Sequence, residues 1–212
     1  KNDDNGVTVN EYFKPPVPIT FGAMAVHHVT SKMVEDKPVF IGSKTETELK
    51  QALENNLVVA HNAPFDINIL KNEGIEISEF IDTLRIARHI LDSEGYSLQF
   101  LRYSLDLGIV GMAHDAMGDV IVLESLFEYL KTKLTDEFSL KTDEEILDKM
   151  KELTKMPVLI DTFLFGKHRG KTFKDVAGED KSYMQWLINS ESSKPELEQN
   201  EDLVYTLKHY LG

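Results

Sequence analysis

A short strand, a polar turn and a helix follow one another without a break at residues 57–70, L-V-V-A-H-N-A-P-F-D-I-N-I-L. Four apolar residues of strand type come first, and after the turn Phe65, Ile69 and Leu70 recur at helical spacing. Asp66 therefore lies at the start of a helix that follows a buried strand. Open α/β sheets form their sites at the carboxyl ends of the strands. The pattern predicts an α/β domain with Asp66 at that edge.

A second acidic stretch, A-H-D-A-M-G-D-V-I-V-L-E-S-L-F-E-Y-L, covers residues 113–130. Apolar residues recur at helical spacing from Val120 onward, so Asp119 lies in the first turn of an amphipathic helix and His114 on the loop before it. A carboxylate and an imidazole so placed can face one cleft, where one holds a metal and the other moves a proton. Alternatively, Asp119 only caps or decorates the helix start.

Together the two stretches resemble the DEDDh, or DnaQ-like, branch of the exonucleases with a ribonuclease-H-like fold. H-N-A-P-F-D at 61–66 looks like the second motif of that family, and H-D-A-M-G-D at 114–119 looks like its H-x-A-x-x-D third motif. A further segment, A-V-H-H-V-T at 25–30, is similar to the A-I-H-G-I-T segment of the family.

The resemblance implies a metal-dependent 3′–5′ exonuclease that hydrolyses phosphodiester bonds of DNA or RNA and releases nucleoside monophosphates. It implies two Mg²⁺ or Mn²⁺ ions, with Asp66 and Asp119 as ligands and His114 as the base. It also places Asn62, Phe65 and His27 against the substrate. The implied partners are single-stranded or frayed DNA 3′ ends, or RNA, and a DNA polymerase.

The first motif of that family, D-x-E on a strand, is missing, because no D-x-E-T followed by glycine occurs in the chain. Asn5-Gly6 signals a hairpin turn, and a strand is predicted at 7–12. Either the sequence is a fragment whose upstream strands carry the motif, or the protein kept the fold and lost catalysis. We expect a fragment, since the missing strand would be central in the sheet. The alternative is an inactive nucleic-acid-binding or polymerase-associated module.

The remaining patterns up to residue 131 predict alternating strands and helices. Three prolines forbid a helix before about Phe21, and residues 45–56 form a helix with a threonine cap. A short strand leads into a helix at 79–91, with Asp82 as its cap, and another helix ends at Gly108. We predict a ribonuclease-H-like three-layer α/β domain with a mixed sheet over residues 1–131.

Charged residues dominate 132–157, where a weak apolar stripe predicts a helical connector. Residues 158–212 then form a small α+β appendage that resembles the F-G-K-x-x-G-K module of exonucleases of the exonuclease X type. Its basic turn holds Lys167, Arg169, Lys171 and Lys174 without an acid, between aromatic residues. Such a turn suits phosphate contact and base stacking, so Lys167, Arg169 and Lys171 are predicted to bind nucleic acid. A solvated hairpin over a small aromatic core is the alternative.

Composition limits the other possibilities. The net charge of -13 argues against binding of nucleic acid by bulk attraction, but a local groove with bound cations can reverse the sign where it matters. With no cysteine, the chain has neither disulfides nor thiolate metal sites. No run approaches the ~20 apolar residues of a membrane span, and no secretory signal is visible. We therefore expect a cytoplasmic protein without a membrane partner.

Overall fold

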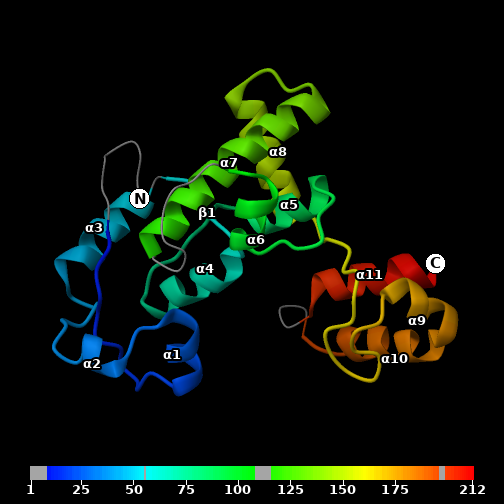
Figure 1. The fold of residues 1–212 in the computed structure, drawn as a ribbon, viewed down its shortest axis with the longest axis horizontal. Coiled ribbons are helices and arrows are strands. Elements are labelled where there is room, and N and C mark those ends of the chain that lie inside the picture. Colours follow the sequence, from blue (N-terminus) through cyan, green and yellow to red (C-terminus); the bar gives the residue numbers. More distant parts are fainter. Residues whose placement is uncertain (1–8, 55, 108–115, 196–198) are drawn as a thin grey trace. The chain divides into compact units, whose positions relative to one another are not determined.

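The computed structural model describes residues 9–54, 56–107, 116–195 and 199–212. The chain divides into two compact units, Lys1–Thr154 and Lys155–Gly212, each with its own hydrophobic core. The first unit combines a small parallel sheet with helices, and the second is mostly helical (Figure 1). The predicted α/β class is confirmed.

Two parallel strands position the candidate site. β1 (Val58–Ala60) pairs with β2 (Phe80–Asp82), and Ala60 lies opposite Asp82 in the register. Helix α4 (Ala63–Asn72) follows β1, and helix α5 (Thr83–Ile90) follows β2. Because the strands are parallel, both helices begin at the same edge of the sheet. The strand–turn–helix pattern predicted at 57–70 is confirmed.

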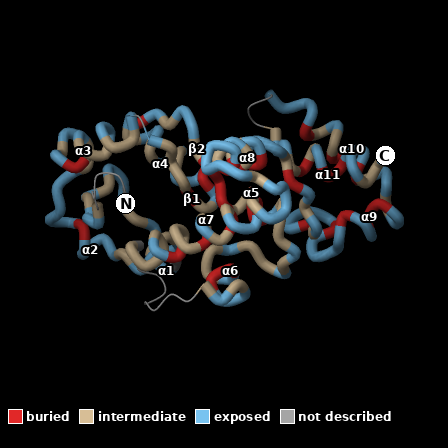
Figure 2. The backbone as a smooth tube through the Cα atoms, turned by 90° about the horizontal axis from the view of Figure 1, so that it is seen from above, coloured by how far each residue is buried: buried red, intermediate tan, exposed pale blue. Residues whose placement is uncertain are grey.

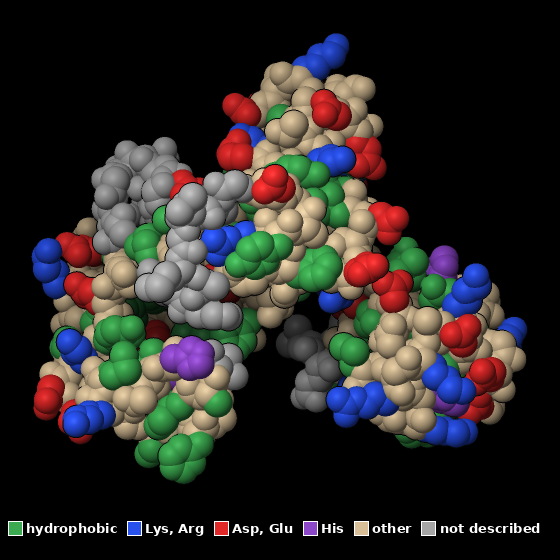
Figure 3. All heavy atoms as spheres, viewed as in Figure 1, with side chains coloured by type: hydrophobic (Ala, Val, Ile, Leu, Met, Phe, Trp, Pro, Cys, Tyr) green, Lys and Arg blue, Asp and Glu red, His purple; other side chains and the backbone are tan. Residues whose placement is uncertain are grey.

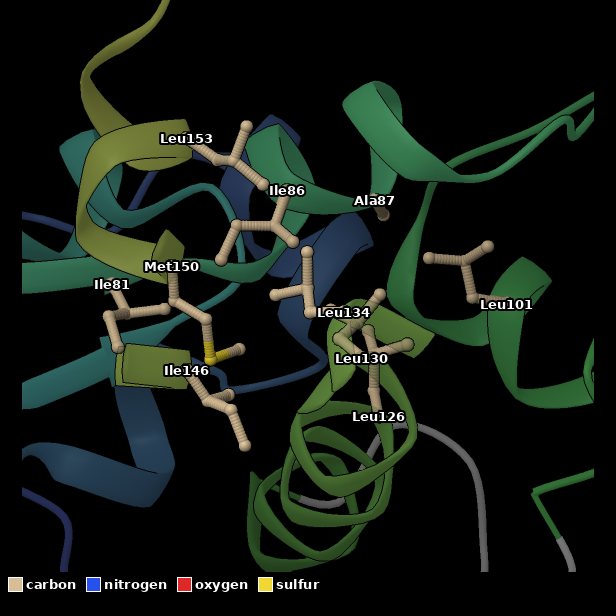
Figure 4. Close-up of a cluster of buried hydrophobic side chains, with 10 residues drawn as sticks. All are labelled: Ile81, Ile86, Ala87, Leu101, Leu126, Leu130, Leu134, Ile146, Met150 and Leu153. Atoms are coloured by element: carbon tan, nitrogen blue, oxygen red, sulfur yellow. The ribbon is translucent and has the colours of Figure 1, made fainter. Parts of the chain in front are cut away.

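Helices α5, α6 (Leu98–Ser104), α7 (Ala116–Phe138) and α8 (Asp143–Lys155) enclose the core of the first unit. Figure 2 shows buried positions along α5, α7 and α8. The close-up in Figure 4 shows apolar side chains from these helices and from β2 turned toward one another. The buried members are Ile81, Ile86, Ala87, Leu101, Leu126, Leu130, Leu134, Ile146, Met150 and Leu153. Packing of this kind stabilises the edge from which α4 and α5 start.

The segment predicted as a connector, 132–157, takes part in both units. Residues 132–138 complete α7, and α8 buries Ile146, Met150 and Leu153 in the first core. The Thr154 hydroxyl also accepts the backbone N–H of Asp82 at 3.0 Å. A four-residue apolar stripe suits a solvated helix or a packed one, and only the tertiary contacts distinguish them.

The N-terminal part differs from the strand predicted at 7–12. Residues 9–12 form no strand, and residues 1–8, with the Asn5-Gly6 turn, lie outside the described part. A strand needs a ladder partner, but here Lys14 donates its N–H to the carbonyl of Pro38 in a loop, at 2.9 Å. Phe13 meets Phe40 edge to face at 5.2 Å between ring centroids. This segment is therefore fixed by loop contacts.

Three helices precede β1: α1 (Phe21–His27), α2 (Ser31–Val34) and α3 (Lys44–Leu53). As the three prolines predict, no helix begins among the described residues before Phe21. The threonine cap predicted for α3 is wrong, because Ser43 caps this helix by accepting the N–H of Glu46 at 3.0 Å. Thr45 is instead buried and donates its hydroxyl to Glu11 at 2.7 Å.

The C-terminal unit consists of α9 (Phe173–Glu179), α10 (Lys181–Ser192) and α11 (Glu201–Leu211). Its β content over the described residues is one isolated antiparallel bridge, between Thr162 and Thr172. The buried side chains are Phe163, Phe173, Val176, Ala177, Met184, Leu187, Leu203 and Leu207. Among the described helices of both units, none combines the length and the apolar character that crossing a bilayer requires.

Candidate active site

Asp82 joins the ends of the two strands. It is 5% exposed, and its Oδ1 accepts the N–H of Asn62 at 2.9 Å and that of Leu84 at 3.0 Å. The bond to Leu84 confirms the predicted helix cap. The bond to Asn62 was not predicted, and it fixes a residue in the left-handed conformation, with φ of 69°. Asp82 therefore sets the starting direction of α4 as well as that of α5.

Asp66 lies in the first turn of α4, at the carboxyl end of β1. Partial burial of its carboxylate raises the pKa of this group above the ordinary value of 3.8, and the charge of nearby Asp82 adds to the increase. A backbone hydrogen bond acts in the opposite direction, and no cationic side chain contributes. A carboxylate in this position favours a bound cation, because the cation would offset both the burial and the repulsion.

Asp119 lies in the first turn of α7, where its Oδ1 accepts the side-chain N–H of Gln99 at 2.6 Å. A carboxylate has several acceptor positions, so this bond leaves room for a cation. Asp66 and Asp119 both offer the hard oxygen ligands that Mg²⁺ and Mn²⁺ prefer. Within the described residues, no three His, Asp or Glu side chains gather into a metal-binding group. His114 lies outside the described residues.

The predicted substrate contacts have different surroundings. Phe65, in α4 beside Asp66, is 64% exposed, and Asn62 is also exposed. Both therefore remain accessible next to the candidate carboxylate. His27, at the end of α1, accepts the N–H of Val29 on its Nδ1 at 3.0 Å. No hydrogen bond of the described residues links it to the two aspartates.

His61 is a site-forming residue that our sequence analysis did not select. Its Nε2 lies 2.8 Å from the carbonyl of Tyr96, and its Nδ1 lies 2.9 Å from the hydroxyl of Thr83. Burial lowers the pKa of the ring. The Tyr96 carbonyl can only accept, so Nε2 donates to it, while the Thr83 hydroxyl lies within hydrogen-bond distance of both Nδ1 and the Ala60 carbonyl. His61 thus ties the end of β1 to the start of α5. Its place as the first residue of H-N-A-P-F-D was the only signal.

The basic turn of the C-terminal unit is closed by the N–H of Gly170, which donates to the carbonyl of Phe163 at 2.8 Å. Two of its three predicted nucleic-acid contacts already hold a carboxylate. Lys167 pairs with Asp180 at 2.7 Å, and Lys171 pairs with Glu179. The Lys171–Glu179 pair is exposed on both sides, and such pairs contribute little, so a phosphate could displace its carboxylate. The Asp180 side chain is only 17% exposed, so its pair with Lys167 is better shielded from solvent. Arg169 is exposed, and it makes no ion pair with another residue of the described part.

Asp180 anchors this turn to α10. It caps the helix by accepting the N–H of Tyr183 at 3.1 Å, and it bonds the buried ring of His168 at 3.0 Å. Lys167 first, then Ser182 and His168, hold the pKa of the Asp180 carboxyl well below its usual range. Because the folded-state pKa is depressed, the ionised Asp180 carboxylate stabilises the fold at pH values above its ordinary pKa. This stabilisation is lost as the pH falls toward the folded-state pKa.

Gly166 should be far less tolerant of alanine than Gly170 is. Both have positive φ, 68° and 87°, so a side chain at either position adds about 1–2 kcal/mol of backbone strain. At Gly166 the new Cβ would also collide with the Tyr183 hydroxyl, whereas at Gly170 nothing lies within 4 Å. Unfolding followed by the fluorescence of Trp186, the single tryptophan of the chain, should show the larger loss for Gly166→Ala.

Tyr183→Phe provides the control for this comparison, because it removes the hydroxyl and leaves the ring. It should restore most of the difference between the two glycine variants. Equal losses for Gly166→Ala and Gly170→Ala would contradict the collision.

Family models match both parts of the chain. The model described as "Exonuclease" matches residues 1–127, and the one described as "Exodeoxyribonuclease X-like C-terminal" matches residues 163–192.

Individual proteins agree with these matches. Exodeoxyribonuclease 10 of Escherichia coli (strain K12) is 33% identical over 203 residues, 93% of this chain and 82% of that protein. The DNA polymerase III subunit epsilon of Buchnera aphidicola is 31% identical over 133 residues, 58% of this chain and 55% of its own length. The solved structure of exonuclease X in complex with 5′ overhanging duplex DNA superposes with a TM-score of 0.51 at 26% identity, covering 69% of this chain and 82% of that one.

Proposed function

The chain belongs to the DnaQ-like exonuclease family, and from this we propose that it removes nucleoside monophosphates from DNA 3′ ends in a reaction that requires a divalent metal. One observation carries the proposal. Asp66 lies at the carboxyl end of a parallel strand, its pKa is raised by partial burial and by Asp82, and it forms no ion pair with another residue of the described part. A carboxylate held in this way is suited to a metal.

Asp66 and Asp119 would be ligands of two Mg²⁺ or Mn²⁺ ions. When bound, the metal would lower the pKa of the attacking water and neutralise charge on the phosphate. His114 would accept the proton of that water as the general base. Phe65 and Asn62, both accessible beside Asp66, would seat the terminal nucleotide and so align its phosphodiester bond.

DNA is the proposed substrate because the relatives that cover most of the chain are named for it. One is an exodeoxyribonuclease, and exonuclease X was solved with a 5′ overhanging duplex. We propose single-stranded or frayed 3′ ends as the form that is cleaved. The matches to DNA polymerase III epsilon subunits support a DNA polymerase as a candidate partner.

The position of the label on the oligonucleotide tests the polarity. With the full-length gene product and Mn²⁺, a 3′-labelled strand should release labelled mononucleotide at once, whereas a 5′-labelled strand should shorten stepwise. EDTA should stop both reactions, and added metal should restore them. Immediate release of mononucleotide from the 5′ label would overturn the polarity, and turnover in EDTA would overturn the metal requirement.

The same assay separates the enzyme from an inactive binding module. His114→Ala should abolish turnover and leave oligonucleotide binding intact, because it removes the proposed base and keeps the residues proposed to seat the nucleotide. A wild-type protein that binds DNA but does not shorten it with Mg²⁺ or Mn²⁺ would establish the binding module. Preferential cleavage of RNA would overturn the choice of DNA.

A further inference from the structure

Three aromatic side chains of the C-terminal unit, Phe165, Tyr183 and Trp186, are linked through the buried ring of Phe163. Tyr183 and Trp186, one turn apart in α10, lie 5.7 Å apart between ring centroids. The ring centroid of Phe163 lies 6.1 Å from that of Tyr183 and 6.2 Å from that of Phe165. Trp186 is 59% exposed and Phe165 is 44% exposed, although both contact neighbouring rings. We name Phe165, Tyr183 and Trp186 the aromatic surface.

The aromatic surface has a rigid base. Phe163 stacks on Phe173 at 3.7 Å between centroids, and both are fully buried. Tyr183 also packs edge to face on His168, which Asp180 holds. Gly166 leaves just enough space for the Tyr183 hydroxyl. Rings that are already ordered lose little conformational entropy when a ligand covers them.

A run of cations borders the aromatic surface in a chain that is acidic as a whole, although two of them, Lys167 and Lys171, are paired with Asp180 and Glu179. Residues 163–174 carry four cations and no acid, while the whole chain has a net charge of -13. Figure 3 shows several Lys and Arg side chains on this unit, with Asp and Glu side chains among them. In the turn, the N–H groups of Arg169, Gly170 and Lys171 all donate to carbonyls. An anion would therefore meet side chains. Of the four cations, Arg169 and Lys174 make no ion pair with another residue of the described part, and Arg169 is the one within the turn.

We propose that the aromatic surface binds single-stranded DNA, with bases stacked on Trp186 and Phe165 and a phosphate held by Arg169. Exposed aromatic rings beside cations suit a single strand, because unpaired bases present their faces and each nucleotide adds one negative charge. A protein partner would cover the apolar rings but would not by itself account for the local positive charge. The choice of DNA rests on the proposed function.

Such a site would aid the exonuclease simply because the two units belong to one chain. A strand held on the C-terminal unit is kept at high effective concentration near the first unit, wherever the two lie. The aromatic surface should therefore matter for long single strands and not for dinucleotides.

Trp186 reports on its own site, since it is the only tryptophan. Titration of the whole protein with a 16-nucleotide oligo-dT in EDTA, which prevents turnover, should quench its fluorescence to saturation. The labelled oligonucleotide, followed by anisotropy, should bind Trp186→Ala about 5- to 150-fold more weakly than wild type, the range that loss of one stacked base gives. Arg169→Gln should weaken binding and reduce its dependence on salt.

Tyr205→Ala is the matched control, because Tyr205 is an exposed aromatic of the same unit, in α11, outside the aromatic surface. It should leave the affinity unchanged. An affinity unaffected by Trp186→Ala, or equally reduced by Tyr205→Ala, would overturn the proposal, as would quenching by blunt duplex equal to that by the single strand.

The stacking site and the exonuclease activity can each be refuted without refuting the other. Metal-dependent release from DNA 3′ ends with no quenching of Trp186 would remove the stacking site and leave the exonuclease. Quenching of Trp186 by DNA without turnover in Mg²⁺ or Mn²⁺ would remove the exonuclease and leave the stacking site.

Discussion

Asp66→Asn should lower exonuclease turnover by at least about 100-fold, because loss of even an outer-shell partner of a metal ligand costs 10- to 100-fold. The amide keeps the size of the side chain but loses its charge, so metal affinity falls with it. End-labelled single-stranded DNA in a Mn²⁺ titration measures both effects. Asp148→Asn, an exposed acid of α8 in the same unit, should change neither.

Without metal, the same variant should be more resistant to heat than wild type. The folded-state pKa of Asp66 is raised, so its ionised form destabilises the fold at neutral pH. This penalty decreases as the pH falls through the raised pKa and disappears below the ordinary value of 3.8. Melting curves in EDTA, followed by circular dichroism, should therefore converge toward acid pH.

Saturating Mg²⁺ or Mn²⁺ should reverse the order of thermal stability between wild type and Asp66→Asn, because the metal stabilises the folded protein that binds it. Wild type should then melt above Asp66→Asn. If Asp66→Asn were less stable than wild type in EDTA at neutral pH, the carboxylate would have a structural role. Turnover close to that of wild type would exclude Asp66 as a ligand.

Asp82→Ala should destabilise the first unit by about 1–3 kcal/mol, because two partly buried backbone N–H groups lose their acceptor. It should also lower turnover, since Asn62 would no longer be held at the start of α4 and Asp66 would lose its position. Urea unfolding followed by far-ultraviolet circular dichroism measures the stability. Trp186 fluorescence, which reports the C-terminal unit, should show an unchanged transition.

Asp82→Asn is the matched control, because its side-chain oxygen can still accept both N–H groups. It should lower the free energy of unfolding by less than about 1 kcal/mol, because the hydrogen bonds are retained, and it should keep most of the turnover. It also removes the charge that raises the pKa of Asp66, so the acid limb of the pH–rate profile should move to lower pH. If Asp82→Asn lost as much turnover as Asp66→Asn, Asp82 would be a metal ligand instead of a positioning residue.

Several features of the fold could be predicted because they depend on neighbours along the chain. The strand before His61 and the cap at Asp82 each follow from spacing within one turn of helix or one strand. The N-terminal strand and the threonine cap of α3 were wrong. A strand depends on a partner that local alternation does not specify, and Ser43 lies two residues before the predicted segment.

The residues of the candidate site also fall into two groups, those that sequence motifs identified and those that only the tertiary structure revealed. Family motifs identified Asp66, Asp119 and His114, and their metal and base roles remain predictions. The sequence did not indicate that Asp82 would hold Asn62, 20 positions away, or that His61 would join Thr83 and Tyr96. These bonds require two parallel strands to end side by side, which no local pattern encodes.

By itself, then, the sequence determined the family, the α/β class and the order of the acidic motifs, because these depend on residue type and short spacing. The tertiary structure decided that α8 belongs to the core of the first unit and that Lys167 and Lys171 are paired within the C-terminal unit. It also brought Trp186 into ring contact with Tyr183 beside the basic turn. Such pairings are set by which surfaces meet when the chain folds, since distant residues compete for the same partner.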